Sequence, residues 1–354
     1  MAKRPTIVDV ARLAGVSLGT ASQALNKKKG VASQTVLKVL EAAEMLNYYP
    51  SLSARQLREQ ASNLISLYIP IPIERKIHHS TWSFYFPIIQ GFMEELQMND
   101  YRIHLEFIEM KELADHSQLT AHALGYHIQS VAFILPYKGD FSGIIKLKDI
   151  GTNVVTIYAE IGESISSVCI NNLAAAKNAV IWLGSLGHTE IGFIGGEETH
   201  FAAIERKKGY LAGIKGICDQ NMYVGDWTIR SGIEGFKYFI EKQRTPTAVF
   251  CANDHMAIGV LKACTELGIQ IPGEISIVGF DDNFICQVSD PQLTSVKMPL
   301  FRMGREAART LFSMHKKNTT HIEHKILKSQ LIIRDSTASY ESVNAVSQLL
   351  ENGA

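Results

Sequence analysis

Three short helical patterns lie close together in the first fifty residues, and this feature constrains the fold more than any other. Thr6 is a helix N-cap candidate, and Asp9 three residues later completes a capping-box pattern. Gly15 ends the first helix, and Ser17 is the N-cap candidate of the second. A third helix begins near Ser33. A tight turn between two helices this short predicts a helix-turn-helix.

The apolar residues of these helices recur at helical spacing and predict one shared core. They are Ile7, Val10, Ala11 and Ala14 in the first helix, Ala21, Ala24 and Leu25 in the second, and Val36, Val39, Leu40, Ala43 and Leu46 in the third. On this pattern alone, a generic three-helix domain remains an alternative.

The outward face of the second helix favours DNA as the partner. Its residues are short or hydrogen-bonding and uncharged, namely Leu18, Gly19, Thr20, Ser22, Gln23 and Asn26. A face made only for water would carry more Glu and Lys. Small polar groups near a helix N-terminus suit base edges in the major groove, and flanking basic residues such as Lys27 suit phosphates. We expect Thr6 and Ser17 to contact the DNA as well.

The charge of the chain divides at the same place. Residues 1–60 hold nine Lys and Arg against four Asp and Glu, a net charge of +5, and the remaining residues carry −5. A basic end on an acidic body fits a phosphate-binding module joined to a body that does not bind DNA. No apolar run approaches the ~18 residues of a membrane span, and no apolar segment follows the N-terminus. We therefore expect a cytoplasmic protein with no membrane partner.

From Asn63 onward, short apolar strands alternate with helical stretches. Strands are predicted at residues 64–69, 103–107, 130–135, 154–157, 191–194, 248–251 and 275–278, and helices between them, for example at 88–98, 173–186 and 255–267. This alternation predicts parallel sheets built from βαβ units. Two lobes of similar size suit its length better than one sheet.

Polar side chains follow two of the predicted strands. Asn253 comes after the strand that ends at Cys251, and Asp281 after the strand that ends at Val278. Ligands of α/β proteins bind in the crevice at the carboxyl ends of parallel strands. Both side chains could hydrogen-bond the hydroxyls of a sugar, or either could cap a turn.

Several long blocks of the sequence resemble the lactose-repressor (LacI/GalR) family of transcriptional regulators. The headpiece blocks are residues 7–17, 20–26, 39–43 and 46–50. The blocks of the body are residues 186–188, 191–196, 246–257, 275–282 and 291–296. The resemblance covers nearly the whole chain, and the headpiece match is ungapped.

For DNA binding, the resemblance implies a homodimer on a pseudo-palindromic double-stranded operator. It also implies that residues 51–62 are a hinge, which orders in the minor groove of bound DNA and uses Ser53, Arg55 and Leu57. Leu57 occupies the position of a wedge leucine that unstacks a base step. A plain linker is the alternative. Gln23 stands where the family usually has Arg, and Gln pairs best with adenine, so we expect a different preference at that base.

For the body, the resemblance implies an α/β fold of periplasmic-binding-protein type I, with two Rossmann-like parallel-sheet lobes and a small-molecule effector between them. We expect an all-α headpiece at 1–50, one lobe at 63–162 and 294–322, a second lobe at 163–293 and 323–338, and a tail at 339–354. Arg206 matches the effector-clamping arginine and Trp227 the aromatic wall. Phe84 and Tyr85 match an aromatic pair after the first strand. A sugar or sugar derivative is the expected effector.

Three departures from the family pattern bear on the effector and the assembly. Residues 73–82 are an apparent insertion before Phe84, which weakens that assignment. Ile204 stands where the family often has a second arginine, so the ligand is expected to be less polar there. Val343, Val346 and Leu350 have heptad-like spacing, which is compatible with a tetramer-forming helix, but a pattern of about one and a half heptads is short and favours a frayed tail.

Other functional classes have less support. A solute-binding protein without a DNA role would not need the helix-turn-helix. An enzyme on a doubly wound fold is disfavoured because residues 192–196 lack the G-x-G-x-x-G spacing and no P-loop motif occurs. Five scattered cysteines without a CxxC pair predict neither a zinc site nor disulfides. We expect no enzyme activity, no cofactor and no metal. A corepressor or purine-type response is the alternative to induction by a sugar.

Overall fold

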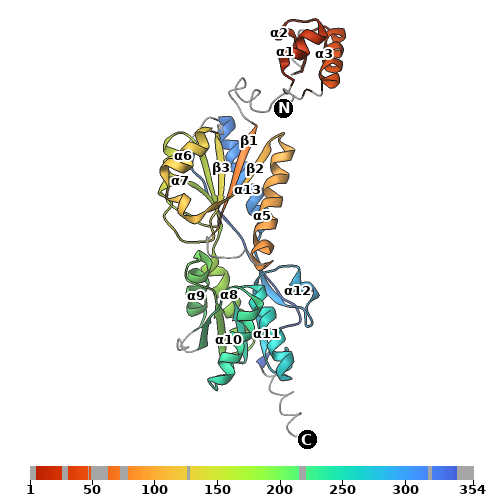
Figure 1. Ribbon diagram of the computed structural model, residues 1–354. Helices are drawn as coiled ribbons and strands as arrows, with labels where there is room; N and C mark the ends of the chain where they lie inside the picture. Colours follow the sequence, from red (N-terminus) through yellow and green to blue (C-terminus); the bar gives the residue numbers. More distant parts are fainter. Residues whose placement is uncertain are drawn as a thin grey trace. The chain divides into compact units, whose positions relative to one another are not determined.

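A computed structural model describes residues 5–25, 31–46, 48, 63–71, 79–125, 128–214, 221–317 and 321–340, and the chain divides into two units between Ser62 and Asn63 (Figure 1). The first unit holds α1 (Ile7–Ala14), α2 (Leu18–Leu25) and α3 (Ser33–Met45). The second holds two lobes, each built on one sheet.

The caps of the first two helices form as their sequence predicts. The backbone N–H and the hydroxyl of Thr6 both donate to Asp9 Oδ2, at 2.9 and 2.7 Å. Gly15 ends α1 in the left-handed conformation at φ 65°, which glycine adopts without steric cost. Ser17 Oγ accepts from the N–H of Thr20 at 3.0 Å and so caps α2. The helix-turn-helix is therefore fixed by local chemistry.

The three helices share a small core around the fully buried Val10, Ala21 and Val39. The expectation that Leu40 faces inward is wrong, because its side chain is 45% exposed. Helix α3 instead buries Val39 together with Ala42 and Ala43. Successive helical residues point about 100° apart, so Leu40 falls beside this stripe and not on it.

The first lobe is a parallel six-stranded sheet in the order β11-β5-β4-β3-β1-β2. Its strands are β1 (Leu64–Ile71), β2 (Arg102–Glu109), β3 (Ser130–Ile134), β4 (Asn153–Ile157), β5 (Ser166–Ile170) and β11 (His324–Leu327). Its helical elements are α5 (His79–Met98), η1 (Met110–Leu113), α6 (His116–Gly125), α7 (Ser142–Asp149) and α13 (Leu300–Lys317). Helices α5 and α13 pack closely because Gly91 and Gly304 lie against backbone, where a Cβ would overlap a carbonyl oxygen.

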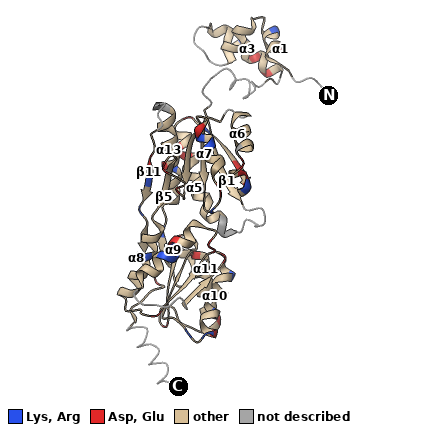
Figure 2. Cartoon of the chain, turned by 90° about the vertical axis from the view of Figure 1, so that its left-hand side faces the viewer, with Lys and Arg blue, Asp and Glu red and all other residues tan. Residues whose placement is uncertain are grey.

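The second lobe has the sheet order β12-β10-β9-β8-β6-β7, parallel except for β12. Its strands are β6 (Ile191–Gly195), β7 (Met222–Val224), β8 (Ala248–Cys251), β9 (Ser276–Asp281), β10 (Thr294–Lys297) and β12 (Gln330–Ile332). Its helices are α8 (Asn172–Ser185), α9 (Phe201–Gly213), α10 (Ile229–Glu241), α11 (Asp254–Leu267) and α12 (Ile285–Val288). In Figure 2 basic and acidic residues lie mixed over both lobes.

The lobe boundaries differ from the expected ones in three places. Strand β5 and strand β11 pair with each other in the first sheet, so residues 166–170 and 324–327 belong to the first lobe. Strand β10 pairs with β9, so residues 294–297 belong to the second lobe. The lobe to which each of these strands belongs is set by partners distant in the chain, and local sequence does not reveal such pairing.

None of the described helices is long and apolar enough to cross a membrane.

Candidate functional site

The outward face of α2 presents the polar residues that the sequence assigns to DNA. Ser17, Leu18, Gly19 and Gln23 are exposed, and Thr20 and Ser22 are half-buried. The helix carries no charged side chain. Because Ser17 Oγ also lies 2.8 Å from Thr20 Oγ1, part of the hydroxyl chemistry at this end holds the cap. Asn26, Lys27, Ser53, Arg55 and Leu57 lie outside the described residues.

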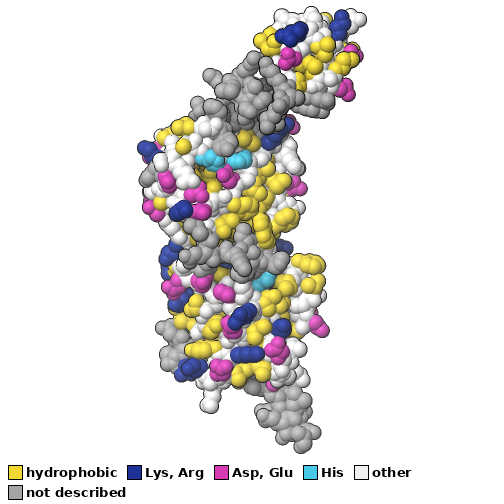
Figure 3. All heavy atoms as spheres, viewed as in Figure 1, with side chains coloured by type: hydrophobic (Ala, Val, Ile, Leu, Met, Phe, Trp, Pro, Cys, Tyr) yellow, Lys and Arg dark blue, Asp and Glu magenta, His cyan; other side chains and the backbone are white. Residues whose placement is uncertain are grey.

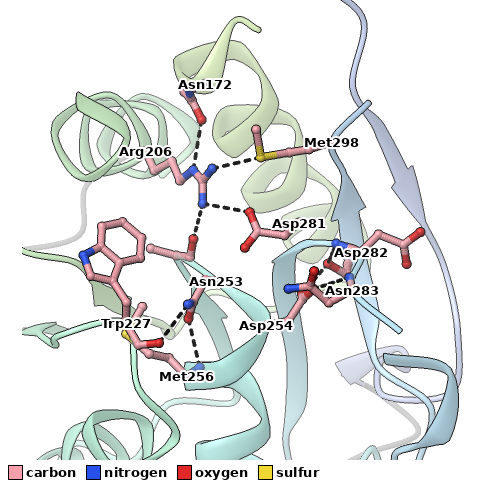
Figure 4. A network of polar contacts seen from close by, with 12 residues as sticks. Asn172, Arg206, Trp227, Asn253, Asp254, Met256, Asp281, Asp282, Asn283 and Met298 are labelled. Carbon is pink, nitrogen blue, oxygen red and sulfur yellow. Dashed lines mark hydrogen bonds and ion pairs between the residues drawn. The ribbon is translucent and has the colours of Figure 1, made fainter. Parts of the chain in front are cut away.

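In the second unit, Arg206 of α9 is the centre of a polar network (Figure 4). Its side chain is buried, and Nε donates to Asn172 Oδ1 at 3.0 Å. Nη1 donates to the carbonyl oxygen of Ala252 and lies 3.5 Å from Asp281 Oδ1. Nη2 donates to the hydroxyl of Tyr158 at 3.3 Å. Each guanidinium nitrogen therefore has a partner within the protein.

The same guanidinium links the two lobes. Tyr158 follows β4 of the first lobe, whereas Arg206 belongs to the second. Nη2 also lies 3.2 Å from the sulfur of Met298, in the crossing segment between β10 and α13. The planar group lies 3.5 Å from the ring centre of Phe280, a cation–π contact. A ligand that reached Arg206 would compete with contacts from both lobes.

Two carboxyl groups lie near this arginine at the end of β9 and the start of α11. Burial raises the pKa of Asp281, and the nearby Arg206 opposes that rise. Burial and the carboxylate of Asp281 together raise the pKa of Asp254. Asp254 accepts from Ser295 Oγ at 2.5 Å and from the N–H of Asn283 at 2.7 Å, so it also has a structural role. Asp281 is the last residue of β9, a strand that extends beyond its predicted end, and its φ is 112°.

Asn253 and Trp227 make their polar contacts with each other and with other groups of the protein. The Oδ1 of Asn253 caps α11 by accepting from the N–H of Met256, and its Nδ2 donates to the carbonyl of Trp227, both at 2.9 Å. The indole N–H of Trp227 donates to His200 Nδ1 at 3.2 Å. Gly196 lies directly under this ring, where a Cβ would overlap it. The cap that the sequence left open as an alternative for Asn253 is therefore present.

The two predicted aromatic residues of α5 occupy different environments. Tyr85 is buried in the core, and burial raises its pKa well above the ordinary value. Phe84 is half-buried, and its ring meets the ring of Tyr158 edge-on at 4.8 Å. Phe84 therefore joins the network around Arg206, whereas Tyr85 belongs to the buried core. Residues 79–82 begin α5, and residues 73–78 lie outside the described residues.

The sequence interpretation missed residues at the carboxyl ends of first-lobe strands. Tyr158 follows β4, and Tyr137 follows β3. Tyr137 pairs with His200 in an antiparallel bridge, and their rings lie 4.3 Å apart. Lys138 N–H donates to the carbonyl of Thr199 at 2.8 Å, so this bridge joins the two lobes. Applying the strand-end rule to both lobes would have found these tyrosines.

Comparisons with known proteins match both units. Residues 6–51 match the model described as bacterial regulatory proteins, lacI family, and residues 182–337 match a periplasmic binding protein-like domain. The chain is 30% identical to the probable HTH-type transcriptional repressor ExuR of Bacillus subtilis (strain 168), over 94% of this chain and 98% of that protein. It is 31% identical to catabolite control protein A of Priestia megaterium, over 94% and 99%.

Two solved structures share the fold over nearly the whole chain. The lac repressor dimer bound to operator and the anti-inducer ONPF matches with a TM-score of 0.81 at 24% identity, over 95% of this chain and 100% of that one. A complex of the transcriptional regulator CelR with cellobiose matches with a TM-score of 0.68 at 27% identity, over 94% and 100%.

Proposed function

Because the chain belongs to the lacI family of bacterial regulatory proteins, we propose that it represses transcription from a pseudo-palindromic operator as a homodimer under the control of a sugar-like effector. The family consists of DNA-binding transcriptional regulators with a ligand-binding sensor domain, and not of enzymes. The repressor logic, the operator symmetry and the sugar are our proposal.

The exposed, uncharged face of α2 supports operator reading by direct contact. Gln23 and Ser17 are exposed on this face, and α2 starts with a formed cap, in which Ser17 Oγ accepts from the N–H of Thr20. Two headpieces on one duplex would read two half-sites with opposite orientation. A twofold dimer therefore implies a pseudo-palindromic operator.

The network around Arg206 is the observation that carries the effector proposal. Arg206 and Asp281 offer donors and acceptors of opposite charge, so a neutral polyhydroxyl ligand needs no further counter-charge there. Phe84 and Trp227 supply aromatic surface, which suits the apolar face of a sugar ring. The related CelR was solved with cellobiose, which supports the same ligand class here.

We describe the control as a shift between two arrangements of the lobes. An effector that displaces Tyr158 from Arg206 removes a contact that joins the lobes, and one that displaces Asp281 changes the ion pairing of the same arginine. The hinge at residues 51–62 connects the headpiece to the first strand of the first lobe. A coupling of about 1–3 kcal/mol would change operator affinity about 5- to 150-fold.

Operator selection from a random DNA pool, with the full chain, tests the DNA proposal. We expect enrichment of a pseudo-palindrome. Leu57→Ala should weaken binding to that sequence much more than binding to unrelated DNA, because the wedge acts only on the operator. Equal losses on both DNAs would contradict the wedge, and an asymmetric or unenriched pool would contradict the dimeric operator.

A thermal-shift screen against sugars, phosphosugars and nucleobases tests the effector proposal. We expect a sugar to raise the Tm and to change operator affinity. Asp281→Asn should remove this response and leave operator binding unchanged, since the side chain is far from the headpiece in sequence and keeps its size. A response to nucleobases alone would overturn the sugar and favour a corepressor of purine type.

A further inference from the structure

His200, the residue before α9, contacts one aromatic side chain from each lobe. Its ring centre lies 4.3 Å from that of Tyr137 in the first lobe and 4.9 Å from that of Trp227 in the second. The indole N–H of Trp227 also donates to His200 Nδ1 at 3.2 Å. One imidazole ring thus joins a residue of the proposed effector site to the opposite lobe.

The backbone determines how close Tyr137 and His200 lie. Two hydrogen bonds flank this pair, from the N–H of Phe201 to the carbonyl of Pro136 at 3.0 Å and from the N–H of Lys138 to the carbonyl of Thr199 at 2.8 Å. Tyr137 and His200 are therefore a non-hydrogen-bonded antiparallel pair, the kind in which facing side chains lie closest. A shift between the lobes would separate these two rings before it reached either core.

Trp227 has a backbone conformation that needs support from its surroundings. Its φ is 71°, in the left-handed region that bulky residues avoid. Asn253 Nδ2 donates to its carbonyl oxygen at 2.9 Å, as Figure 4 shows, and a side chain at Gly196 would overlap the indole ring. A strained residue that several contacts hold in place is typical of a functional site.

The hydrogen bond from Trp227 sets the chemical form of the imidazole. An indole N–H can only donate, so His200 Nδ1 accepts and carries no proton. The hydroxyl of Thr199 lies 3.4 Å from the same nitrogen and can donate to it as well. The ring proton is therefore on Nε2. The orientation of the ring that meets Tyr137 depends in part on where the indole N–H of Trp227 lies.

We propose that His200 is a positioning residue that couples the orientation of Trp227 to the bridge between the lobes. A sugar ring that moves the indole breaks its bond to His200, and the imidazole then loses its fixed place against Tyr137. The bridge between residues 136–138 and 199–201 weakens in turn, so a ligand contact in one lobe reaches the other. The inference rests on the proposed effector site, because Trp227 is its aromatic wall, but the coupling itself needs no ligand.

Hydrogen exchange of the full, effector-free chain, followed by mass spectrometry, measures opening of the bridge at the amides of Lys138 and Phe201. Trp227→Phe keeps a ring and removes the N–H. We expect it to raise exchange at both amides about fivefold, as for the loss of one hydrogen bond. In a His200→Phe chain, which already lacks the acceptor, adding Trp227→Phe should change nothing further. The control is Tyr223→Phe, which removes a hydroxyl next to Tyr238 in the same lobe and should leave both amides as in the wild type.

The coupling must also run in the opposite direction, from the first lobe to Trp227. Trp82→Phe together with Trp182→Phe leaves Trp227 as the single tryptophan of the chain. In that chain, Tyr137→Ala should shift the emission maximum of Trp227, because His200 loses its ring partner. His200→Asn keeps an acceptor near the position of Nδ1 but has no ring, so Tyr137→Ala should then leave the emission unchanged.

Circular dichroism of each variant shows whether both lobes are folded before exchange or emission is compared. His200→Phe and His200→Asn are independent backgrounds, so one that fails to fold leaves the other test in place. The proposal is overturned if Trp227→Phe leaves both amides unchanged, or if it raises exchange equally with and without His200, as a general loosening would. A sugar screen without a hit would overturn the sugar effector alone, since the coupling is measured without ligand.

Discussion

At the residue scale, our effector proposal depends most on Arg206, a side chain that also has a structural role. It is 1% exposed, and amide, carbonyl, hydroxyl and carboxylate oxygens surround its guanidinium group. A planar guanidinium can meet several acceptors at once and stack on Phe280, whereas the ammonium of a lysine could not. We therefore expect truncation of Arg206 to lower stability as well as to remove the proposed ligand contacts, so Asp281→Asn is the better test of the effector proposal.

The pH dependence of stability depends on Asp254, another single residue. Its pKa is higher in the folded chain than in the unfolded one, where it is about 3.9. The folded state thus holds its proton more tightly, so its contribution to stability is greatest at low pH and is lost as the pH rises through the folded pKa. Asp254→Asn removes this dependence and keeps an acceptor for the N–H of Asn283.

Between about pH 5 and pH 8, we expect the free energy of unfolding of the wild type to fall as the pH rises. The fall in Asp254→Asn should be smaller by roughly 1–3 kcal/mol. Urea unfolding at several pH values measures the difference. Asp149→Asn, at an exposed aspartate, is the matched control and should follow the wild type. Parallel pH profiles of the wild type and Asp254→Asn would mean that the Asp254 pKa is not raised.

The preferred base at one position of each operator half-site is also expected to depend on a single residue. Gln23 is exposed on α2, and its amide suits adenine, whereas arginine suits guanine. We expect Gln23→Arg to change the preferred base at one position of each half-site, with discrimination of about 1–3 kcal/mol. Operator selection with both proteins measures it, and Gln23→Ala should only relax the same position. An unchanged profile would show that Gln23 does not contact a base.

At the element scale, polar side chains cap the starts of helices and connect them to neighbouring segments. The capping box of Thr6 and Asp9 starts α1, and Asn253 starts α11 while it holds the backbone of Trp227. Between lobes, the bridge of Tyr137 and His200 is a contact of two loops and not of packed cores. Loop contacts of this kind can break and re-form without unfolding either lobe.

The cap of α11 predicts a graded effect of two substitutions at Asn253. Asn253→Ala loses both the cap and the bond to Trp227, so we expect the free energy of unfolding to fall by about 1–2 kcal/mol. Asn253→Ser keeps a capping oxygen and should recover most of that loss. Urea unfolding followed by tryptophan fluorescence measures both. Equal losses in the two variants would show that the cap contributes little.

At the scale of the whole molecule, exposed apolar side chains gather on one part of the first lobe. On the first lobe they include Trp82 and Phe86 of α5 and Leu105 and Phe107 of β2, a strand at the edge of its sheet. Figure 3 shows apolar side chains gathered over this part of the lobe. The rings of Trp82 and Phe107 lie 5.7 Å apart, edge to face. An apolar patch on an open sheet edge favours association, and a second subunit is the partner that our proposal requires.

We expect Phe107→Glu to convert the dimer to a monomer, because it places a charge at the centre of this patch. Size-exclusion chromatography with light scattering measures the mass. The control is Ile326→Glu, which places the same charge on an exposed residue of β11, at the opposite edge of the same sheet. A dimer that persists in Phe107→Glu and dissociates in Ile326→Glu would place the interface at the other edge.

The sequence by itself determined the elements whose signals are local. Caps and a left-handed glycine lie within a few residues of the helices they end, so α1 and α2 were predicted correctly from Thr6, Gly15 and Ser17. The strands β1, β2, β3, β4, β6, β8 and β9 were likewise predicted from their apolar runs, whereas β5, β7, β10, β11 and β12 were not. The polar residues Asn253 and Asp281 were predicted because ligands of α/β proteins bind at the carboxyl ends of parallel strands.

Tertiary structure decided what depends on partners distant in the chain. The lobe to which β5, β10 and β11 belong is set by pairing across the sheet, and short strands carry no mark of their neighbours. The bond of Asn253 to the backbone of Trp227 follows from packing within the second lobe, and the contact of Tyr158 with Arg206 follows from how the two lobes meet. His122 of α6 lies 3.5 Å from Glu106 of β2 because the chain folds back after that strand, which the local sequence does not reveal. Local sequence specifies elements, but only packing specifies which side chains face one another.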